Sequence, residues 1–161
     1  MMKTRLAIPT DAPAIARIYN QGIEDRVATF ETEPRSAADV QSWFTEQYTL
    51  VVVEDGDDIV AFAATFPYRT RECYAGVREF SVYVDRSARG KGAGRVAMER
   101  LIEESRRRGD WKLLSRVFPE NTASLKLLRN LGFREVGTYK NHARLDGEWR
   151  DVVIVELLLN Q

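Results

Sequence analysis

The spacing of apolar residues along the chain predicts a series of helices and strands. Four segments show the recurrence every three to four positions that is typical of helices, and they begin at Thr10 or Asp11, at Ser36 to Asp39, at about Gly92, and at Asn121 or Thr122. Runs rich in Val, Ile, Leu, Phe and Tyr predict strands at 5–8, 50–54, 59–66, 77–84, 111–118, 133–144 and 149–158.

The segments that follow the first predicted helix differ in how clearly they are patterned. Residues 21–34 show no sustained period and predict a long loop or a broken helix. Long loops in compact domains are more often functional than not. The second helix is expected to carry Val40, Trp43, Phe44 and Tyr48 on its apolar face. Gly109 is placed to end the third helix.

Two turn sequences predict hairpins, Asp55-Gly56-Asp57-Asp58 and Leu145-Asp146-Gly147-Glu148. Hairpins combined with helices between other strands predict the α/β (α+β) class. We expect a mixed, mostly antiparallel sheet of about seven strands flanked by about four helices. A single domain spanning 1–161 is expected, because the chain has no repeat or low-complexity linker.

Composition and charge exclude several classes of function. The chain has 24 basic and 24 acidic side chains, so nothing favours binding to nucleic acid or to an anionic membrane. No apolar run approaches the ~18 residues of a membrane span, and no apolar signal core is seen, so we expect a cytoplasmic protein. Cys73 is the only Cys and His142 the only His, which is too few for a Cys/His zinc site, and no metal is expected.

Residues 77–95 predict a strand, a glycine-rich turn and the start of a helix. The turn, Arg89-Gly90-Lys91-Gly92-Ala93-Gly94, contains three glycines and two cations. The first N–H groups of a helix have no intrahelical partner, and the helix dipole favours negative charge beside them. The segment therefore predicts an anion site, of the kind that holds a pyrophosphate.

Glu79 interrupts the otherwise apolar strand that precedes this turn. Strand alternation places it on the same face as Ser81 and Tyr83. A lone buried carboxylate is unfavourable, so Glu79 should lie near a cation, water or a cavity. Such a carboxylate can accept a proton from an amine. The alternative is a structural ion pair with a nearby Arg.

Three arginines, Arg69, Arg71 and Arg78, cluster before the same strand. Forked and permanently charged donors suit a substrate with a carboxylate and a second anionic group. A solvated basic loop is the alternative, and Arg78 is the weakest candidate because it alternates away from Glu79. Further along the chain, Asn121 is placed to cap the fourth helix.

Taken together, these motifs resemble the GCN5-related N-acetyltransferases (GNAT). The turn Arg89–Gly94 matches the R/Q-x-x-G-x-G/A turn of that family, whose backbone amides hold the coenzyme A pyrophosphate. The run 121–133 matches the later Asn and short helix ending in Gly-Phe. The order of predicted elements agrees over nearly the whole chain. The resemblance implies the GNAT fold, with acetyl-CoA as the cosubstrate.

The chain is more closely similar to the phosphinothricin N-acetyltransferase branch. The supporting segments are 18–20, 29–34, 69–74, 79–84 and 147–152. Members of this branch acetylate the amino group of phosphinothricin, methionine sulfoximine or arsinothricin, which gives resistance to these compounds. The resemblance implies a homodimer that acts on a small amino-acid substrate, without nucleic acid or membrane as a partner.

The resemblance also implies roles for individual residues. Glu79 takes the place of the catalytic base, and the amine then attacks the thioester directly, without Cys73 as an acyl carrier. The implied substrate contacts are Phe30, Arg69, Arg71 and Tyr74. The implied coenzyme contacts are Val82, Tyr83, Val84, Arg89, Gly90, Lys91, Gly92, Ala93, Gly94, Arg95, Asn121 and Ser124.

The chain departs from the family pattern in two places. Leu128 stands where many relatives carry a Tyr that protonates the leaving thiolate, so the general acid is open. Asp146 stands where some phosphinothricin enzymes carry a His, and His142 lies nearby. Trp149 and Asp151 are expected to shape the pocket or pin the last hairpin.

Two alternative functions stay open. One is acetylation of protein N-termini or lysines, which would suit an open groove better than a closed pocket. The other is a non-catalytic acetyl-CoA-binding regulatory module, which would not depend on Glu79.

Overall fold

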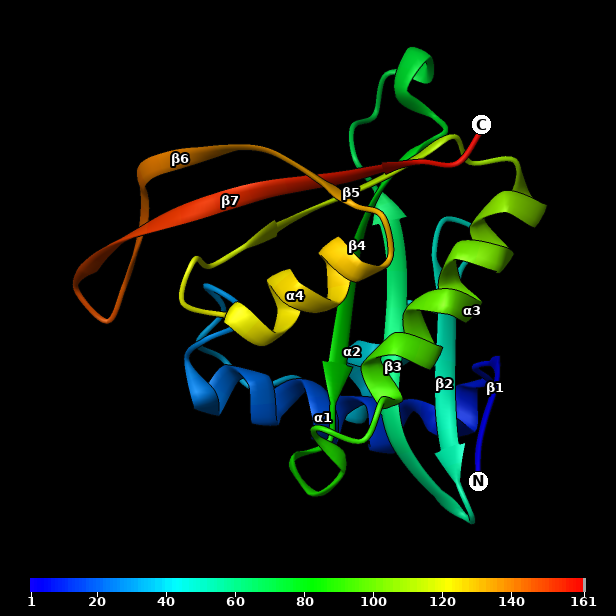
Figure 1. The fold of residues 1–161 in the computed structure, drawn as a ribbon. Coiled ribbons are helices and arrows are strands. Elements are labelled where there is room, and N and C mark those ends of the chain that lie inside the picture. The colour runs from blue at the N-terminus through cyan, green and yellow to red at the C-terminus, as the bar shows by residue number, and fades with distance from the viewer. Residues whose placement is uncertain (161) are drawn as a thin grey trace.

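A computed structural model describes residues 1–160 of the chain. Figure 1 shows its helices and strands. In chain order they are β1 (Met2–Leu6), α1 (Ala12–Asp25), α2 (Ala37–Gln41), β2 (Thr49–Asp55), β3 (Asp58–Pro67), β4 (Val77–Val84), α3 (Ala93–Arg108), β5 (Lys112–Val117), α4 (Thr122–Asn130), β6 (Arg134–Leu145) and β7 (Glu148–Leu158).

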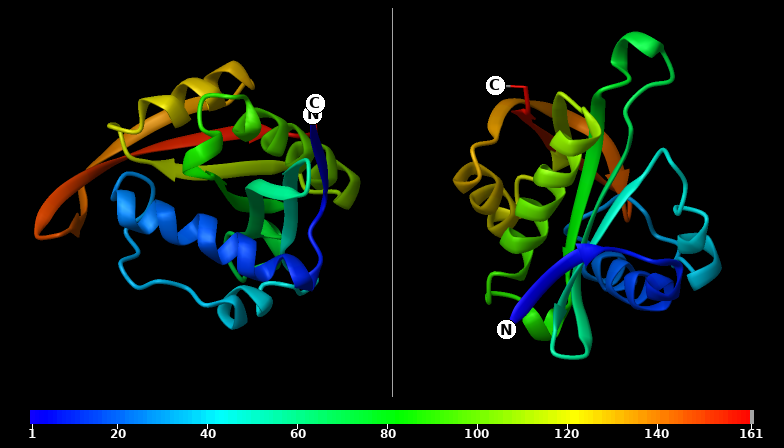
Figure 2. Two further views of the ribbon diagram at one scale, coloured as in Figure 1. Left: turned by 90° about the horizontal axis from the view of Figure 1, so that it is seen from below. Right: turned by 90° about the vertical axis from the view of Figure 1, so that its right-hand side faces the viewer.

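The strands form one seven-stranded sheet in the order β1-β2-β3-β4-β5-β7-β6. Every neighbouring pair is antiparallel except β4 and β5, which are parallel. The helices cover both faces, with α1 and α2 on one side and α3 and α4 on the other (Figure 2). This architecture confirms the fold class predicted from the sequence.

Both faces of the central strands are buried, which explains their nearly continuous apolar sequence. Val51 and Val53 of β2 belong to the cluster that contains Met98 and Leu101 of α3. Val52, between them, belongs to the cluster on the α1 side together with Ile15. Successive residues of one strand therefore serve two separate cores.

Several boundaries near the start of the chain differ from the sequence prediction. The first strand is Met2–Leu6 rather than 5–8, and Ile8 instead precedes a 3₁₀ turn at Pro9–Asp11. Proline has no N–H to donate to the sheet, so the strand ends before it. The first helix runs on to Asp25, and Arg26 ends it in a left-handed conformation, with φ 59°.

The second helix is much shorter than predicted. It covers only Ala37–Gln41, so Trp43, Phe44 and Tyr48 lie beyond its end. The ring of Trp43 packs edge-on against Tyr19 at 5.8 Å between ring centroids and also contacts Phe62. These tertiary contacts, rather than a continuous helical face, account for the apolar spacing of the segment.

The predicted start of α2, end of α3 and turn between β6 and β7 are confirmed, whereas Asp11 stands at the start of α1 without a side-chain cap, because its carboxylate bonds Arg5 and the N–H of Ile8. Ser36 and Asp39 form a reciprocal cap at the start of α2, and Gly109 ends α3 with φ 91°. Asp146 and Gly147 both have positive φ, as a two-residue hairpin turn between β6 and β7 requires. Of the helices in residues 1–160, none is long and apolar enough to span a membrane.

Candidate active site

The sheet opens between its two parallel strands. β4 and β5 pair only from Val77 opposite Lys112 to Glu79 opposite Leu114. Beyond that point β4 stays paired with β3 as far as Val84, and β5 stays paired with β7. The facing edges of the two strands therefore diverge, and main-chain groups of residues 81–84 face the opening instead of a neighbouring strand.

A cavity of about 380 Å³ occupies this opening and reaches both faces of the sheet. On the α1 side its wall includes Tyr19, Thr29, Phe30, Glu79 and Tyr83. On the α4 side it includes Asn121, Ser124 and Leu128. The structure thus brings six residues predicted from the sequence to one cavity: Phe30, Glu79, Val82, Tyr83, Asn121 and Ser124.

Glu79 lies at the closed end of the opening, at the last paired position of β4. Its side chain is 13% exposed, and its Oε1 accepts a hydrogen bond from Nη1 of Arg116 on β5. Glu79 therefore has both environments that the sequence suggested: it lines a cavity, and it forms an ion pair with an arginine. Arg78, by contrast, is buried and does not line the cavity.

The sequence prediction missed Arg116. Its signal was similar to that of Glu79, because Arg116 is a charged residue inside the largely apolar run Leu113-Leu114-Ser115-Arg116-Val117. Nothing in the sequence shows which residue of β5 lies beside Glu79, so the pair became visible only in the sheet.

The glycine turn connects β4 to α3 and is shaped for close approach of an anion. Gly90 and Gly92 have φ of 78° and 90°, and a Cβ added at either position would meet no atom within 4 Å. The backbone hydrogen bonds at the start of α3 begin with Val96, whose N–H donates to the carbonyl oxygen of Gly92. The preceding N–H groups of the helix are thus available to a ligand.

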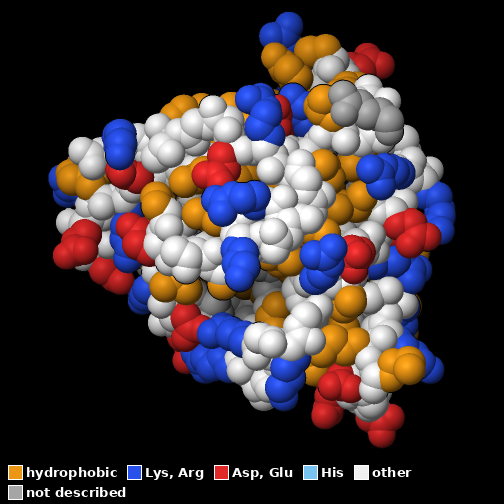
Figure 3. Space-filling view, viewed as in Figure 1, with side chains coloured by type: hydrophobic (Ala, Val, Ile, Leu, Met, Phe, Trp, Pro, Cys, Tyr) orange, Lys and Arg blue, Asp and Glu red, His pale blue; other side chains and the backbone are white. Residues whose placement is uncertain are grey.

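Gly94 serves packing rather than turn geometry. A Cβ there would lie 3.2 Å from Cδ2 of Leu127 and 3.4 Å from Cγ2 of Val84. The glycine therefore lets α3 begin close to both α4 and β4. In Figure 3 the surface is hollowed just above the turn, between α4 and the start of α3, and Lys and Arg side chains surround the turn below.

The arginines of the turn are held by the end of α1. Asp25 accepts hydrogen bonds from Arg86 at 2.9 Å and from Arg89 at 2.7 Å. These donations, that of Arg86 first, lower the pKa of Asp25. Lys91 is exposed at the tip, and Arg95 lies 3.8 Å from Glu99. The arginines of the turn thus already have carboxylate partners, whereas the first main-chain N–H groups of α3 remain free for an anion.

Asp85 organises the start of the turn. Its carboxylate accepts hydrogen bonds from the backbone N–H and the hydroxyl of Ser87, at 3.0 and 2.9 Å, and pairs with Arg17 of α1. The Arg17 guanidinium is the main reason that the pKa of Asp85 falls to about 2. The carboxylate is thus an anionic anchor between α1 and the turn.

Asn121 caps α4, as predicted, because its side chain accepts a hydrogen bond from the N–H of Ser124 at 3.2 Å. Leu128, about two helical turns further along α4, lines the cavity and is 1% exposed. Its apolar side chain cannot donate a proton. On the other side of the opening, burial raises the pKa values of Tyr19 and Tyr83.

The long loop after α1 forms one wall of the cavity, as expected for a functional loop. The ring of Phe30 packs edge-on against Phe118 at 4.8 Å between centroids. Asn20 holds the far end of the loop, since its side chain exchanges hydrogen bonds of 2.9 and 2.8 Å with the backbone of Arg35.

Arg69, Arg71 and Tyr74 lie elsewhere. They belong to the segment between β3 and β4, which projects from the body of the molecule near the C-terminus in Figure 1. Arg69 stacks on the ring of Tyr68 at 4.2 Å, and Tyr74 packs edge-on against the same ring. None of the three lines the cavity, so a single chain in this conformation does not bring them to Glu79.

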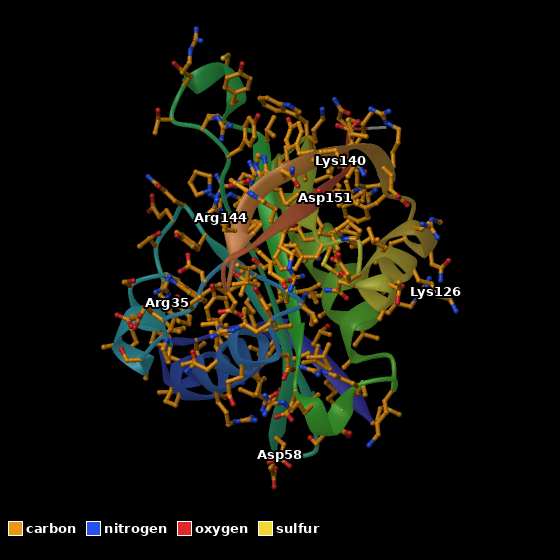
Figure 4. The ribbon with its side chains drawn as sticks, turned by 90° about the vertical axis from the view of Figure 1, so that its left-hand side faces the viewer. Arg35, Asp58, Lys126, Lys140, Arg144 and Asp151 are labelled. Atoms are coloured by element: carbon orange, nitrogen blue, oxygen red, sulfur yellow. The ribbon has the colours of Figure 1, made fainter. Side chains whose placement is uncertain are left out.

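The last hairpin is pinned by its own ion pairs. Asp151 accepts hydrogen bonds from the backbone N–H of Asn141 at 2.9 Å and from Lys140 at 3.3 Å, and Figure 4 shows Lys140 and Asp151 side by side on β6 and β7. His142 stacks on Tyr139, outside the cavity. Among residues 1–160, no group of three His, Cys, Asp or Glu is arranged to hold a metal ion.

The sheet thus splits near a glycine-rich helix start, and a cavity passes through the split from the α1 side to the α4 side. The chain matches the Acetyltransferase (GNAT) family over residues 15–133. It therefore belongs to this family and is an N-acetyltransferase that uses acetyl-CoA.

Three known proteins illustrate its relationships. The L-methionine sulfoximine/L-methionine sulfone acetyltransferase of Pseudomonas aeruginosa is 31% identical over 155 residues, covering 93% of this chain and 90% of that protein. The phosphinothricin acetyltransferase of Sinorhizobium meliloti, solved in complex with acetyl-CoA, is 28% identical, covers 98% and 88%, and has a TM-score of 0.91. The ribosomal-protein-alanine N-acetyltransferase of Brucella melitensis is 32% identical, covers 98% and 99%, and has a TM-score of 0.93.

Proposed function

We propose that the chain transfers the acetyl group of acetyl-CoA to the α-amino group of a small anionic amino-acid analogue, of the phosphinothricin, methionine sulfoximine or arsinothricin type. The observation that carries this proposal is the position of Glu79 in a cavity that runs through the split sheet, from the loop on the α1 side to the start of α4. The names of the Pseudomonas and Sinorhizobium relatives support the substrate class. Acetylation would confer resistance to such a compound.

We expect the coenzyme to enter from the α3 and α4 side. Its pyrophosphate would lie on the main chain of residues 89–95, and its pantetheine arm along the unpaired edge of Val82, Tyr83 and Val84. Asn121 and Ser124 would face the same arm from α4. The exposed glycine turn, the open edge of β4 and the cavity along that edge fit a ligand of this length and charge.

In the proposed reaction Glu79 accepts a proton from the substrate ammonium group. The nitrogen attacks the acetyl carbonyl, a C–N bond forms, the C–S bond breaks, and coenzyme A leaves as a thiolate, while the attacking nitrogen releases its second proton to solvent and the neutral amide forms. Main-chain N–H groups of β4 would polarise the carbonyl oxygen. Leu128 supplies no acid, so we expect the thiolate to leave without a protein proton donor. Cys73 lies on the projecting segment, away from the cavity wall, which favours direct transfer.

Phe30 is proposed to pack against the substrate, because its ring closes the loop side of the cavity. Contacts from Arg69, Arg71 and Tyr74 would require their segment to approach a cavity, either of the same chain or of a second copy. We propose a homodimer. Sedimentation equilibrium should then give twice the mass of the chain.

The proposal is tested by thiol release from acetyl-CoA with phosphinothricin, methionine sulfoximine, arsinothricin and ordinary amino acids. Replacing the base by Glu79→Gln should lower kcat by about 10²–10⁴-fold, the usual contribution of a positioned base, with acetyl-CoA affinity unchanged. Glu135→Gln is the matched control, because Glu135 pairs with Arg129 on the surface of β6. Unchanged kcat in Glu79→Gln would contradict the assignment.

A second candidate function is acetylation of protein N-termini. The similarity to the Brucella protein favours it. Peptides with different N-terminal residues, assayed beside the amino acids, separate the two, since a peptide substrate would be acetylated faster than any free amino acid.

A further inference from the structure

The ion pair between Glu79 and Arg116 spans the opening of the sheet. Glu79 is the last β4 residue paired with β5, opposite Leu114. Arg116 follows Leu114 by two positions on β5, so strand alternation places both side chains on the α1 face. The guanidinium reaches from one diverging strand to the other, where its Nη1 donates to Oε1 of Glu79.

The pair also sets the charge of the cavity. Among the residues that line it, all within the described part of the chain, Arg116 is the one cation, and the carboxylates are Glu31 and Glu79. Arg35 lies 3.2 Å from Glu31 and balances that charge from outside the lining. Glu79 and Arg116 are therefore each other's counterions in the cavity.

An α-amino acid is chemically complementary to such a pair. Its ammonium and carboxylate groups are attached to one carbon, so they can meet a carboxylate and a guanidinium that lie side by side. A zwitterion inserted between Glu79 and Arg116 exchanges one ion pair for two and brings no net charge into the half-buried site. A simple amine opens the pair and leaves the guanidinium without a partner.

We infer that Arg116 binds the α-carboxylate of the substrate, and that the Glu79–Arg116 pair opens to receive a free amino acid. The inference rests on the proposed function, because it requires Glu79 to face the amino group. It adds a specificity determinant, since a peptide N-terminus has no α-carboxylate at this position and would be disfavoured.

The test compares an amino-acid substrate with the amine that remains when its carboxylate is removed. The ratio of their kcat/KM values is the carboxylate preference. We expect Arg116→Gln to reduce this ratio by about 10- to 100-fold, the size of one charged hydrogen bond, chiefly because kcat/KM for the amino acid falls. Arg116→Lys should retain part of the preference.

Arg150→Gln is the matched control, because Arg150 stacks over the ring of Phe118 in the cavity wall but does not line the cavity. It should keep the full preference. For every variant, the urea unfolding transition reports whether the fold is intact, and the acetyl-CoA affinity reports whether the coenzyme site is intact. Both are measured independently of the carboxylate preference.

An unchanged carboxylate preference in Arg116→Gln would overturn the inference. If activity on both substrates then falls by the same factor, Arg116 acts only by positioning Glu79. Failure of the proposed function looks different, since the wild-type chain would then bind acetyl-CoA and release no thiol with any amino acid.

Discussion

Asp25 ties the glycine turn to α1, and its removal tests whether that tie matters for acetyl-CoA binding. The carboxylate meets both Arg86 and Arg89, and its side chain is 23% exposed. The two arginines are about half exposed, so each ion pair contributes the modest energy of a partly solvated pair. Together they should stabilise the turn by about 1–2 kcal/mol.

Asp25→Ala should therefore raise the Kd of acetyl-CoA by about 5- to 30-fold, if the bound turn has the conformation seen here. Glu79 lies at the opposite end of β4, so kcat at saturating coenzyme should not change. Isothermal titration calorimetry measures the first quantity and steady-state kinetics the second. Asp25→Asn keeps one acceptor without the charge and should fall between the wild type and Asp25→Ala.

The control for lost surface charge is Glu103→Ala, which removes a similar pair with Arg107 on the outer face of α3. It should leave the Kd unchanged. A Kd for Asp25→Ala that is unchanged or lower would refute the reasoning, because Arg86 and Arg89 would then bind the coenzyme at least as well without their anchor.

Two further predictions concern stability. The pKa of Asp85 is about 2 in the folded chain, below its ordinary 3.8, so its pairing with Arg17 stabilises the fold above pH 3.8 and is lost as pH falls towards 2. Urea titrations should show Asp85→Asn less stable than wild type by about 1–2 kcal/mol at pH 6, with the gap closing below pH 4. Gly22→Ala in α1 should gain about 1 kcal/mol from helix propensity, but its Cβ would lie 2.7 Å from Cε1 of Tyr83. Overpacking of about 1–3 kcal/mol should outweigh that gain, and a higher melting temperature would disprove this.

The glycine turn and Glu79 show how far the sequence alone could lead. Gly90, Gly92 and Gly94 lie between a strand and a helix, and glycines at that position are typical of a turn that binds an anion. Glu79 was found because a charge in an apolar strand is unfavourable without a local reason. Both predictions depended on residues close together in the chain.

The second helix and the projecting segment show where sequence reasoning failed or stopped. Trp43 and Tyr48 have helical spacing, but their rings pack on α1 and the sheet instead of on a helical face. Arg69 and Arg71 have the right chemistry for an anionic substrate, yet the chain places them away from the cavity. A local pattern does not specify which distant surface a side chain meets.

The sequence by itself determined the order of elements and most of the caps and turns, and it predicted where the coenzyme would bind, because each of these depends on backbone chemistry within a few residues. Only the tertiary structure decided that β4 and β5 diverge after Glu79, and that Arg116 reaches across the gap between them. Strand order and register are set by packing across the whole sheet. A partner on a strand 37 residues away in the chain is therefore visible only once the sheet is assembled.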